Sequence, residues 1–396
     1  MERSVITSNG NIFQMATHLL LKEAEKGSNF VFSPLSFILM LSLVAVGSRG
    51  STLDQMLSFL EVKNISELTS LASRKIFSSL ISPGNENGSP AHDGPILSFA
   101  NGAWIDQSFS LKPSFKEIVE CVYHATAQQV DFANKANRVT RELNSWVENH
   151  TKGLISSLLP PDSLDSSDTV LVLANALYFK GAWDRKFDAS RTEHRNFHLL
   201  NGQIVQVPFM TQMPYQRQLY RSFDGYKVLK IPYQSDQKSR EFFMYFFLPD
   251  ARAGLYDLIP IFELQEFCKR EFEFQEEDLR EFWIPRFKFS FKFEASNTMK
   301  ESGLALPFSG GLTEMVESGT PHYSLVLSKV FHESCIEANE DGTEAATSTA
   351  PTLRKYCAVW PPPTFVADHP FMFMIKEEKS KMVVFIGAVL NPFLGT

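Results

Sequence analysis

The stretch Glu340-Asp-Gly-Thr-Glu-Ala-Ala-Thr-Ser-Thr-Ala350 is the part of the sequence that decides the fold. It consists almost wholly of small residues, so burial of its side chains cannot hold it in place. Its threonines are β-branched and its alanines are small, which suits the crowded interior of a β-sheet. Extended sequence precedes it at residues 328–338 and follows it at residues 365–371. The pattern predicts a loop that is exposed in one state and forms a strand in another.

Length and composition are those of a large globular protein. The chain has 396 residues, of which 44% are hydrophobic and 21% are charged, so it can bury a substantial core. The length alone would suit two or three domains, but no linker divides the chain, and the Gly-, Pro- and Asn-rich residues 82–95 indicate a surface loop. A net charge of -7 without a basic cluster argues against nucleic acid as the main partner.

Cysteine spacing and the first residues bear on the cellular compartment. The cysteines at positions 121, 268, 335 and 357 lack the spacing of a zinc site or a redox pair, so we expect reduced thiols. The N-terminus shows no basic region followed by an apolar core, which favours a cytoplasmic or nucleocytoplasmic location over an extracellular one. Residues 30–47 are mostly apolar, but their serines and proline favour a buried helix over a membrane span.

Hydrophobic periodicity predicts a mixture of helices and strands. Apolar residues fall on one helical face over residues 12–20 and again over residues 139–147. The expected strands, which are either continuously apolar or alternate apolar with polar residues, are residues 169–179, 242–248, 285–294, 371–375 and 382–390. Helices dominate the first third and strands the last half, so we predict an α+β fold.

Motifs of the common enzyme classes are missing from the sequence. It contains no Gly-x-Ser-x-Gly elbow, no His-Glu-x-x-His pair and no phosphate-binding glycine loop. Nine histidines and many serines could still meet in space, but no motif supports a hydrolase. We therefore expect no catalytic activity and no cofactor.

Four segments, in order along the chain, resemble motifs of the serpin family. They are Asn29-Phe-Val-Phe-Ser-Pro-Leu-Ser36, Leu173-Ala-Asn-Ala-Leu-Tyr-Phe-Lys-Gly-Ala-Trp183, Glu340-Asp-Gly-Thr-Glu-Ala-Ala346 and Phe365-Val-Ala-Asp-His-Pro-Phe371. The last of these, together with residues 144–155, looks most like plant serpins. The resemblance implies a single serpin domain over residues 1–396, with helices, three β-sheets and an exposed reactive-centre loop that can insert into the main sheet. The hinge and this loop would occupy residues 340–364.

The resemblance also implies a suicide-substrate mechanism of protease inhibition. A protease cleaves the exposed loop and forms an acyl-enzyme, and the freed loop then inserts into the main sheet and distorts the trapped protease. Insertion would begin at a hinge whose residues are small apart from one glutamate, and they are Gly342, Thr343, Glu344, Ala345 and Ala346. By strand alternation, Thr343 and Ala345 would point inward and Glu344 outward.

Pro351 departs from the pattern that favours insertion. A proline in a central strand removes a ladder hydrogen bond, at roughly 1–3 kcal/mol. Slow insertion would let the protease deacylate and escape. The alternative function is therefore a non-inhibitory serpin that acts as a binding or chaperone-like module.

The family spacing places the reactive bond between Tyr356 and Cys357. An aromatic residue there would suit a chymotrypsin-like protease. Arg354 and Lys355 lie just upstream, so trypsin-like serine proteases, papain-like cysteine proteases or metacaspases could cleave one or two bonds earlier. Alternatively, the basic pair only keeps the loop soluble. The expected partners are proteases alone, without nucleic acid or membrane, and we expect a monomer.

Two further groups of residues match parts of the serpin machinery. The shutter is a polar cluster beneath the strands that separate, and its residues here are Ser33, Ser36, Asn175 and His332. The breach is the point where the loop first enters, and its residues here are Trp183, Arg286 and Glu340. We expect an ion pair between the last two. Buried polar groups in the shutter should hydrogen-bond one another and change partners when the sheet opens.

Overall fold

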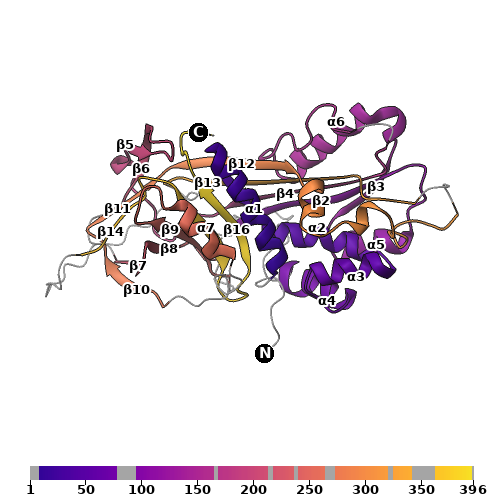
Figure 1. Ribbon diagram of the computed structural model, residues 1–396, viewed down its shortest axis with the longest axis horizontal. Coiled ribbons are helices and arrows are strands. Elements are labelled where there is room, and N and C mark those ends of the chain that lie inside the picture. Colours follow the sequence, from indigo (N-terminus) through magenta and orange to yellow (C-terminus); the bar gives the residue numbers. More distant parts are fainter. Residues whose placement is uncertain are drawn as a thin grey trace, which may run out of the picture.

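The computed structural model describes residues 9–77, 95–164, 168–212, 217–235, 240–263, 273–319, 324–340 and 362–394. These residues form α-helices and three β-sheets (Figure 1), which confirms the predicted α+β class. The helices are α1 (Gly10–Lys26), α2 (Pro34–Val46), α3 (Gly50–Phe59), α4 (Ile65–Ser70), α5 (Pro113–Cys121), α6 (Phe132–His150), α7 (Leu255–Glu263) and α9 (Ser296–Glu301). Within these ranges, no helix is both long enough and apolar enough to cross a membrane.

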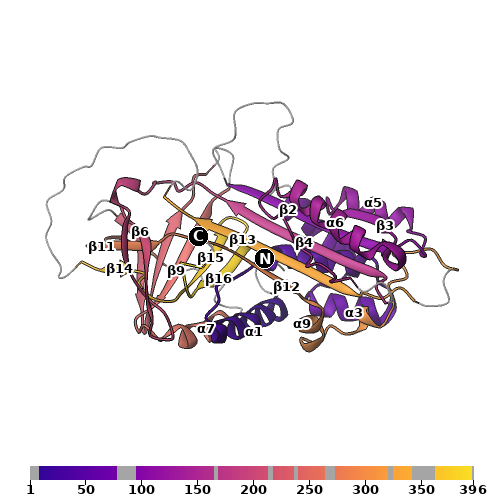
Figure 2. The same cartoon turned by 90° about the horizontal axis from the view of Figure 1, so that it is seen from above.

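The central layer is a five-stranded sheet in the order β12-β13-β4-β2-β3. Its strands are β2 (Ile96–Asp106), β3 (Thr126–Val130), β4 (Leu171–Lys180), β12 (Phe287–Glu294) and β13 (Lys329–Ala338). Figure 2 shows β2, β4, β13 and β12 side by side. Strand β4 is buried at every residue except the last, as its continuous apolar run predicts. It pairs antiparallel with β2 but parallel with β13.

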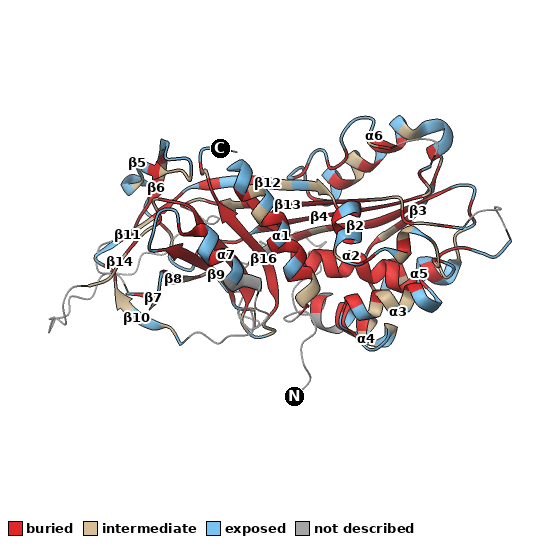
Figure 3. Cartoon of the chain, in the orientation of Figure 1, coloured by how far each residue is buried: buried red, intermediate tan, exposed pale blue. Residues whose placement is uncertain are grey.

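Helices cover both faces of this sheet. Helix α6 lies on one face and α2 on the other (Figure 1). Every residue of α2 is buried (Figure 3), which confirms a buried helix in this region. The helix does not extend over all of residues 30–47, however, because residues 30–32 form strand β1 (Phe30–Phe32). It begins at Pro34, since the Ser33 side chain accepts a hydrogen bond from the Ser36 backbone N–H and caps the first turn.

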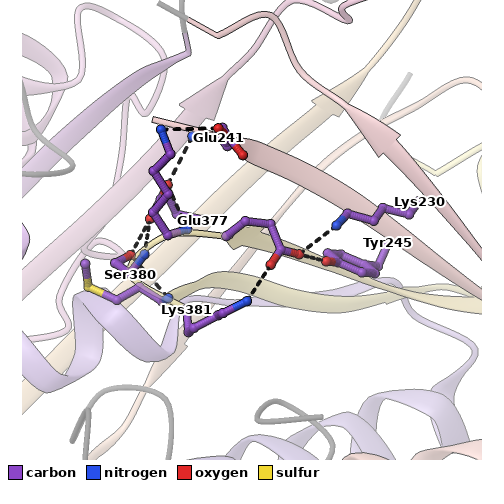
Figure 4. A network of polar contacts seen from close by, with 9 residues as sticks. Lys230, Glu241, Tyr245, Glu377, Ser380 and Lys381 are labelled. Carbon is purple, nitrogen blue, oxygen red and sulfur yellow. Dashed lines mark hydrogen bonds and ion pairs between the residues drawn. The ribbon is translucent and has the colours of Figure 1, made fainter. Parts of the chain in front are cut away.

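The largest sheet has seven strands in the order β1-β16-β15-β9-β8-β7-β10. Besides β1, its strands are β7 (Arg217–Phe223), β8 (Tyr226–Pro232), β9 (Phe242–Pro249), β10 (Gln275–Asp278), β15 (Phe371–Glu377) and β16 (Val383–Val389). Strands β15 and β16 form the predicted C-terminal hairpin. Polar contacts, drawn in Figure 4, join the hairpin turn to neighbouring strands. The Glu378 carboxylate accepts hydrogen bonds from Lys230 of β8 and from the Tyr245 hydroxyl of β9.

A four-stranded sheet in the order β14-β11-β6-β5 completes the fold. Its strands are β5 (Glu193–His198), β6 (Ile204–Met210), β11 (Glu281–Pro285) and β14 (Thr364–Val366). Strand β14 pairs in parallel with β11 at the edge of this sheet. The chain therefore leaves the five-stranded sheet at the end of β13 and enters a different sheet at β14.

Candidate functional site

The candidate site is the boundary between β4 and β13, which we call the seam. Residues 329–336 of β13 pair directly and in parallel with residues 172–179 of β4, so the two strands are adjacent and the sheet is closed. Residues 339–340 follow β13 at one end of the seam, which we call the upper end. The segment that the sequence identifies as a loop thus starts where β13 leaves the seam.

A cluster of fully buried polar side chains lies at the middle of the seam. The Ser36 hydroxyl donates to Asn175 Oδ1, and Asn175 Nδ2 donates back to the Ser36 carbonyl over 3.3 Å. His332 Nδ1 lies 2.8 Å from Asn175 Oδ1, and His332 Nε2 lies 3.0 Å from the Ser334 hydroxyl. The hydroxyl of Ser33, the N-cap of α2, accepts a hydrogen bond from the Ser36 backbone N–H. The structure therefore brings together all four predicted shutter residues, and the bond from β13 to β4 crosses the seam.

The hydrogen-bond partners of His332 fit a neutral imidazole. Asn175 Oδ1 only accepts, so the ring hydrogen lies on Nδ1, and Nε2 accepts from Ser334. Burial lowers the pKa of His332 to about 3. The ring is therefore neutral at physiological pH, and both of its nitrogens are satisfied.

The sequence reasoning missed one residue of this cluster and a second buried polar residue on the neighbouring strand β2. Ser334 lies two positions after His332 on β13, so strand alternation alone could have found it. Asn101 of β2 stands in register with Asn175, and it is 1% exposed. Neither polar atom of its side chain has a hydrogen-bond partner among the described residues. No signal in the sequence indicates Asn101, because its place depends on the register of β2 against β4.

Glu340 fastens the upper end of the seam. Its carboxylate lies 3.4 Å from Arg286 Nε and accepts a hydrogen bond from the Thr192 hydroxyl over 2.6 Å. Its backbone carbonyl accepts from the Phe187 N–H over 3.1 Å. Phe187 and Thr192 both follow β4, so these two bonds cross from the β13 side of the seam to the β4 side. The expected pair of Arg286 with Glu340 is present in the structure.

Trp183, the third predicted breach residue, makes another bond at this end. Its indole Nε1 donates to the Asn339 carbonyl over 2.8 Å. The ring stacks on Tyr233, with 4.5 Å between centroids and 12° between planes. All three predicted breach residues thus lie at the upper end of the seam.

The predicted loop residues lie outside the described residues. They are Gly342, Thr343, Glu344, Ala345, Ala346, Pro351, Arg354, Lys355, Tyr356 and Cys357. The structure places only the two ends of the segment, at Glu340 beside the seam and at Pro362 before β14.

Comparison with known proteins decides the family. A family model described as Serpin (serine protease inhibitor) matches residues 10–392 of the chain. The chain belongs to the serpin family. It is 46% identical to Serpin-ZX of Arabidopsis thaliana over 99% of both proteins, and 43% identical to Serpin-Z1A of Triticum aestivum over 97% of this chain and 95% of that one. The predicted family and the likeness to plant serpins are confirmed.

A solved plant structure shows the same fold. Arabidopsis AtSerpin1 in its native stressed conformation superposes with a TM-score of 0.89 at 46% identity, covering 98% of each chain. The predicted serpin fold with three sheets is therefore confirmed. Serpins are protease inhibitors rather than enzymes, so family membership also confirms that this protein is not an enzyme.

Proposed function

We propose that this serpin is a suicide-substrate inhibitor that traps a protease by inserting its cleaved loop at the seam. The observation that carries the proposal is the parallel pairing of β13 with β4. A strand that turns back after Glu340 runs antiparallel to β13. Because β13 and β4 are parallel, the same strand is also antiparallel to β4. Insertion therefore replaces one parallel pairing with two antiparallel pairings, which are slightly more stable per residue.

The expected gain in free energy is large enough to deform a protease. About fourteen inserted residues, at roughly 1 kcal/mol for each net backbone hydrogen bond, give on the order of 10 kcal/mol. A typical protease domain is stable by about 5–15 kcal/mol. Strand β13, with 10 residues, offers a partner over most of that length.

The contacts across the seam support an order of opening. Trp183 and Glu340 hold the upper end closed, where the inserting strand must enter. The bond between His332 and Asn175 holds the middle. Since these bonds join β13 to the β4 side, each must break before a strand can occupy the seam.

The loop sequence supports a choice of target proteases. Tyr356-Cys357 as the reactive bond favours chymotrypsin-like serine proteases, and cleavage after Arg354 or Lys355 would add trypsin-like enzymes, papain-like cysteine proteases and metacaspases.

An exposed free thiol at Cys121 supports action in a reducing compartment such as the cytoplasm.

Incubation with a panel of these proteases tests the proposal. We expect a covalent complex that survives denaturing electrophoresis with at least one member. Thr343→Arg should abolish the complex and leave only cleaved protein, because a buried unpaired charge opposes the first inserted turn by several kcal/mol. Thr343→Ala, which adds no charge, is the matched control and should still form the complex. Cleavage of the unaltered protein by the panel without any complex would contradict inhibition and support the non-inhibitory alternative.

Pro351 provides a second test of insertion. Pro351→Ala restores a backbone donor within the inserting segment, worth roughly 1 kcal/mol. We expect faster insertion and therefore fewer serpin molecules consumed for each protease trapped. The stoichiometry of inhibition measures this, and an unchanged or higher value would show that the proline does not limit insertion.

A further inference from the structure

Lys292, on the edge strand β12, is hydrogen-bonded to the chain segment that connects α6 with β4. Its ammonium donates to the Ser157 carbonyl over 2.9 Å. Lys292 belongs to β12, which pairs with β13, whereas Ser157 belongs to the connection from α6 to β4. The bond therefore runs from the β13 side of the seam to the β4 side.

The connection that contains Ser157 is firmly held on its own side. Asn144 of α6 donates to the Leu159 carbonyl over 2.9 Å and accepts from the Leu159 N–H over 2.8 Å. Helix α6 is in turn joined to β3 by a bond from Trp146 to Thr126. When a strand enters the seam, β12 and β13 move away from β4 by about one strand spacing, roughly 4.8 Å. The Asn144 contacts survive this movement, but the bond from Lys292 to Ser157 does not.

Glu333 is the cross-strand neighbour of Lys292. The two residues stand directly opposite each other on the antiparallel pair β12–β13, so their side chains lie on the same face of the sheet. Glu333 is 7% exposed, and its Oε2 atom has no hydrogen-bond partner among the described residues. Burial raises the pKa of Glu333, against the opposing effects of Ser290 and Lys292. The closed sheet thus holds an unsatisfied carboxyl oxygen beside a lysine that is bonded elsewhere.

We propose that Lys292 changes partner when the seam opens, from the Ser157 carbonyl to the Glu333 carboxylate. In the closed sheet the Glu333 Oε2 atom is buried without a hydrogen-bond partner, and in the expanded sheet it accepts a bond from Lys292. The exchange therefore lowers the free energy of the expanded sheet relative to the closed one. This inference rests on the proposed function, since it requires that an inserting strand separate β13 from β4. Lys292 and Glu333 act as positioning residues, and neither contacts the protease.

A control pair lies on the same two strands. Lys288 and Glu337 are also in register on β12 and β13, and their charged groups are already 3.0 Å apart in the closed sheet. Their interaction does not depend on a bond across the seam. Its strength should therefore be the same before and after insertion.

Double-mutant cycles on the uncleaved protein and on the loop-cleaved protein test the exchange. The variants are Lys292→Met, which keeps the apolar stem, Glu333→Gln, which keeps the shape, and the two together. Guanidinium unfolding of both forms should show only a weak coupling in the unfolding equilibrium constant for uncleaved protein, below about fivefold, since Lys292 acts there on Glu333 as a cross-strand charge without a hydrogen bond to its Oε2 atom. For cleaved protein it should exceed about tenfold, the effect of a partly buried ion pair with hydrogen bonds. Glu333→Met replaces Glu333→Gln if the latter does not fold. The cycle for Lys288→Met and Glu337→Gln should give one value in both forms.

The outcomes separate this inference from the proposed function. If cleavage of the unaltered protein brings no gain in stability, the loop does not insert and the proposed function is wrong. If the gain is present but the coupling of Lys292 with Glu333 is equal in the two forms, insertion stands and the exchange of partners is overturned.

Discussion

The seam and the C-terminal hairpin are both made of long buried strands, yet they are built in opposite ways. Strands β15 and β16 are buried at every residue, and β15 pairs antiparallel on both sides, with β16 and with β9. The seam pairs in parallel and carries polar side chains at its centre, where His332 meets Asn175. The antiparallel pairing of the hairpin is slightly more stable per residue than the parallel pairing of the seam.

The two regions also differ in how completely their buried polar groups are satisfied. In the hairpin turn, the Glu377 carboxylate accepts bonds from the backbone N–H groups of Glu241, Lys379 and Ser380 and from the Ser380 hydroxyl (Figure 4). Near the seam, the side chain of Asn101 and one oxygen of Glu333 lack partners among the described residues.

The hairpin is tightly packed around Gly387. A Cβ atom added at Gly387 of β16 would lie 2.4 Å from the Phe30 carbonyl oxygen and 2.4 Å from the Phe373 ring. Beside the seam, in contrast, β4 presents the small residues Ala174 and Ala176 to the layer formed by α6 and its following connection. The difference indicates that the fold commits the hairpin to one arrangement and leaves the seam with groups that can change partners.

Glu377→Ala should have the largest effect on stability. The substitution leaves the N–H groups of Glu241 and Ser380 without their acceptor in a site where the glutamate is 3% exposed. We expect a loss of at least about 3 kcal/mol in the free energy of unfolding of the uncleaved protein, measured by urea denaturation. Glu276→Ala on exposed β10 is the control and should stay within about 0.5 kcal/mol of the unaltered protein. Equal losses in the two variants would show that Glu377 stabilises the hairpin turn no more than an exposed carboxylate stabilises β10.

The seam should be more sensitive to acid than the hairpin because of His332. The unfolded imidazole gains a proton below about pH 6.5, but burial lowers the pKa of folded His332 to about 3. Unfolded protein therefore binds more protons between these values, and stability falls as the pH falls through this window. Linkage gives a loss of about 3 kcal/mol between pH 7 and pH 4 from this residue.

Urea denaturation across this pH range measures the effect. His332→Gln should remove most of that part of the pH dependence, whatever its effect on stability at pH 7. A pH dependence that is identical in the His332 variant and the unaltered protein would show that the seam does not carry the acid sensitivity. Glu333 contributes to the pH dependence of stability with the opposite sign. Burial raises its pKa in the folded protein, so its contribution to stability is lost as the pH rises above about 4.5.

Much of this architecture could be predicted from the sequence. The apolar run of β4, the alternation of β12 and the hairpin of β15 and β16 follow from side-chain periodicity, which burial on one or two faces imposes. The family motifs then indicated which distant segments meet, and the structure brings the shutter and breach residues together at the seam. The start of α2 was misplaced, because the cap at Ser33 separates a short strand from the helix within one apolar run.

The other features of the site depend on the register between paired strands, which side-chain periodicity cannot predict. The places of Asn101 beside Asn175, and of Lys292 beside Glu333, follow from how strands far apart in the chain align. A shift of one residue would turn each side chain to the other face of the sheet. The bond from Lys292 to Ser157 also requires the position of an irregular connection, for which the sequence gives no pattern.

Trp183→Phe should have the smallest effect and test the upper end of the seam alone. Phenylalanine can keep the stacking on Tyr233 but removes the indole donor to the Asn339 carbonyl. One such bond contributes about 1 kcal/mol, so local opening should become about fivefold more frequent. Hydrogen exchange of the β13 amides near residues 335–338 measures that opening, and we expect exchange to accelerate there while the β15 amides are unaffected. Trp283→Phe, on the four-stranded sheet, is the matched control and should alter neither. If the Trp183 variant exchanges at the unaltered rate near residues 335–338, Trp183 is a packing residue and the upper end of the seam is held by Glu340 without it.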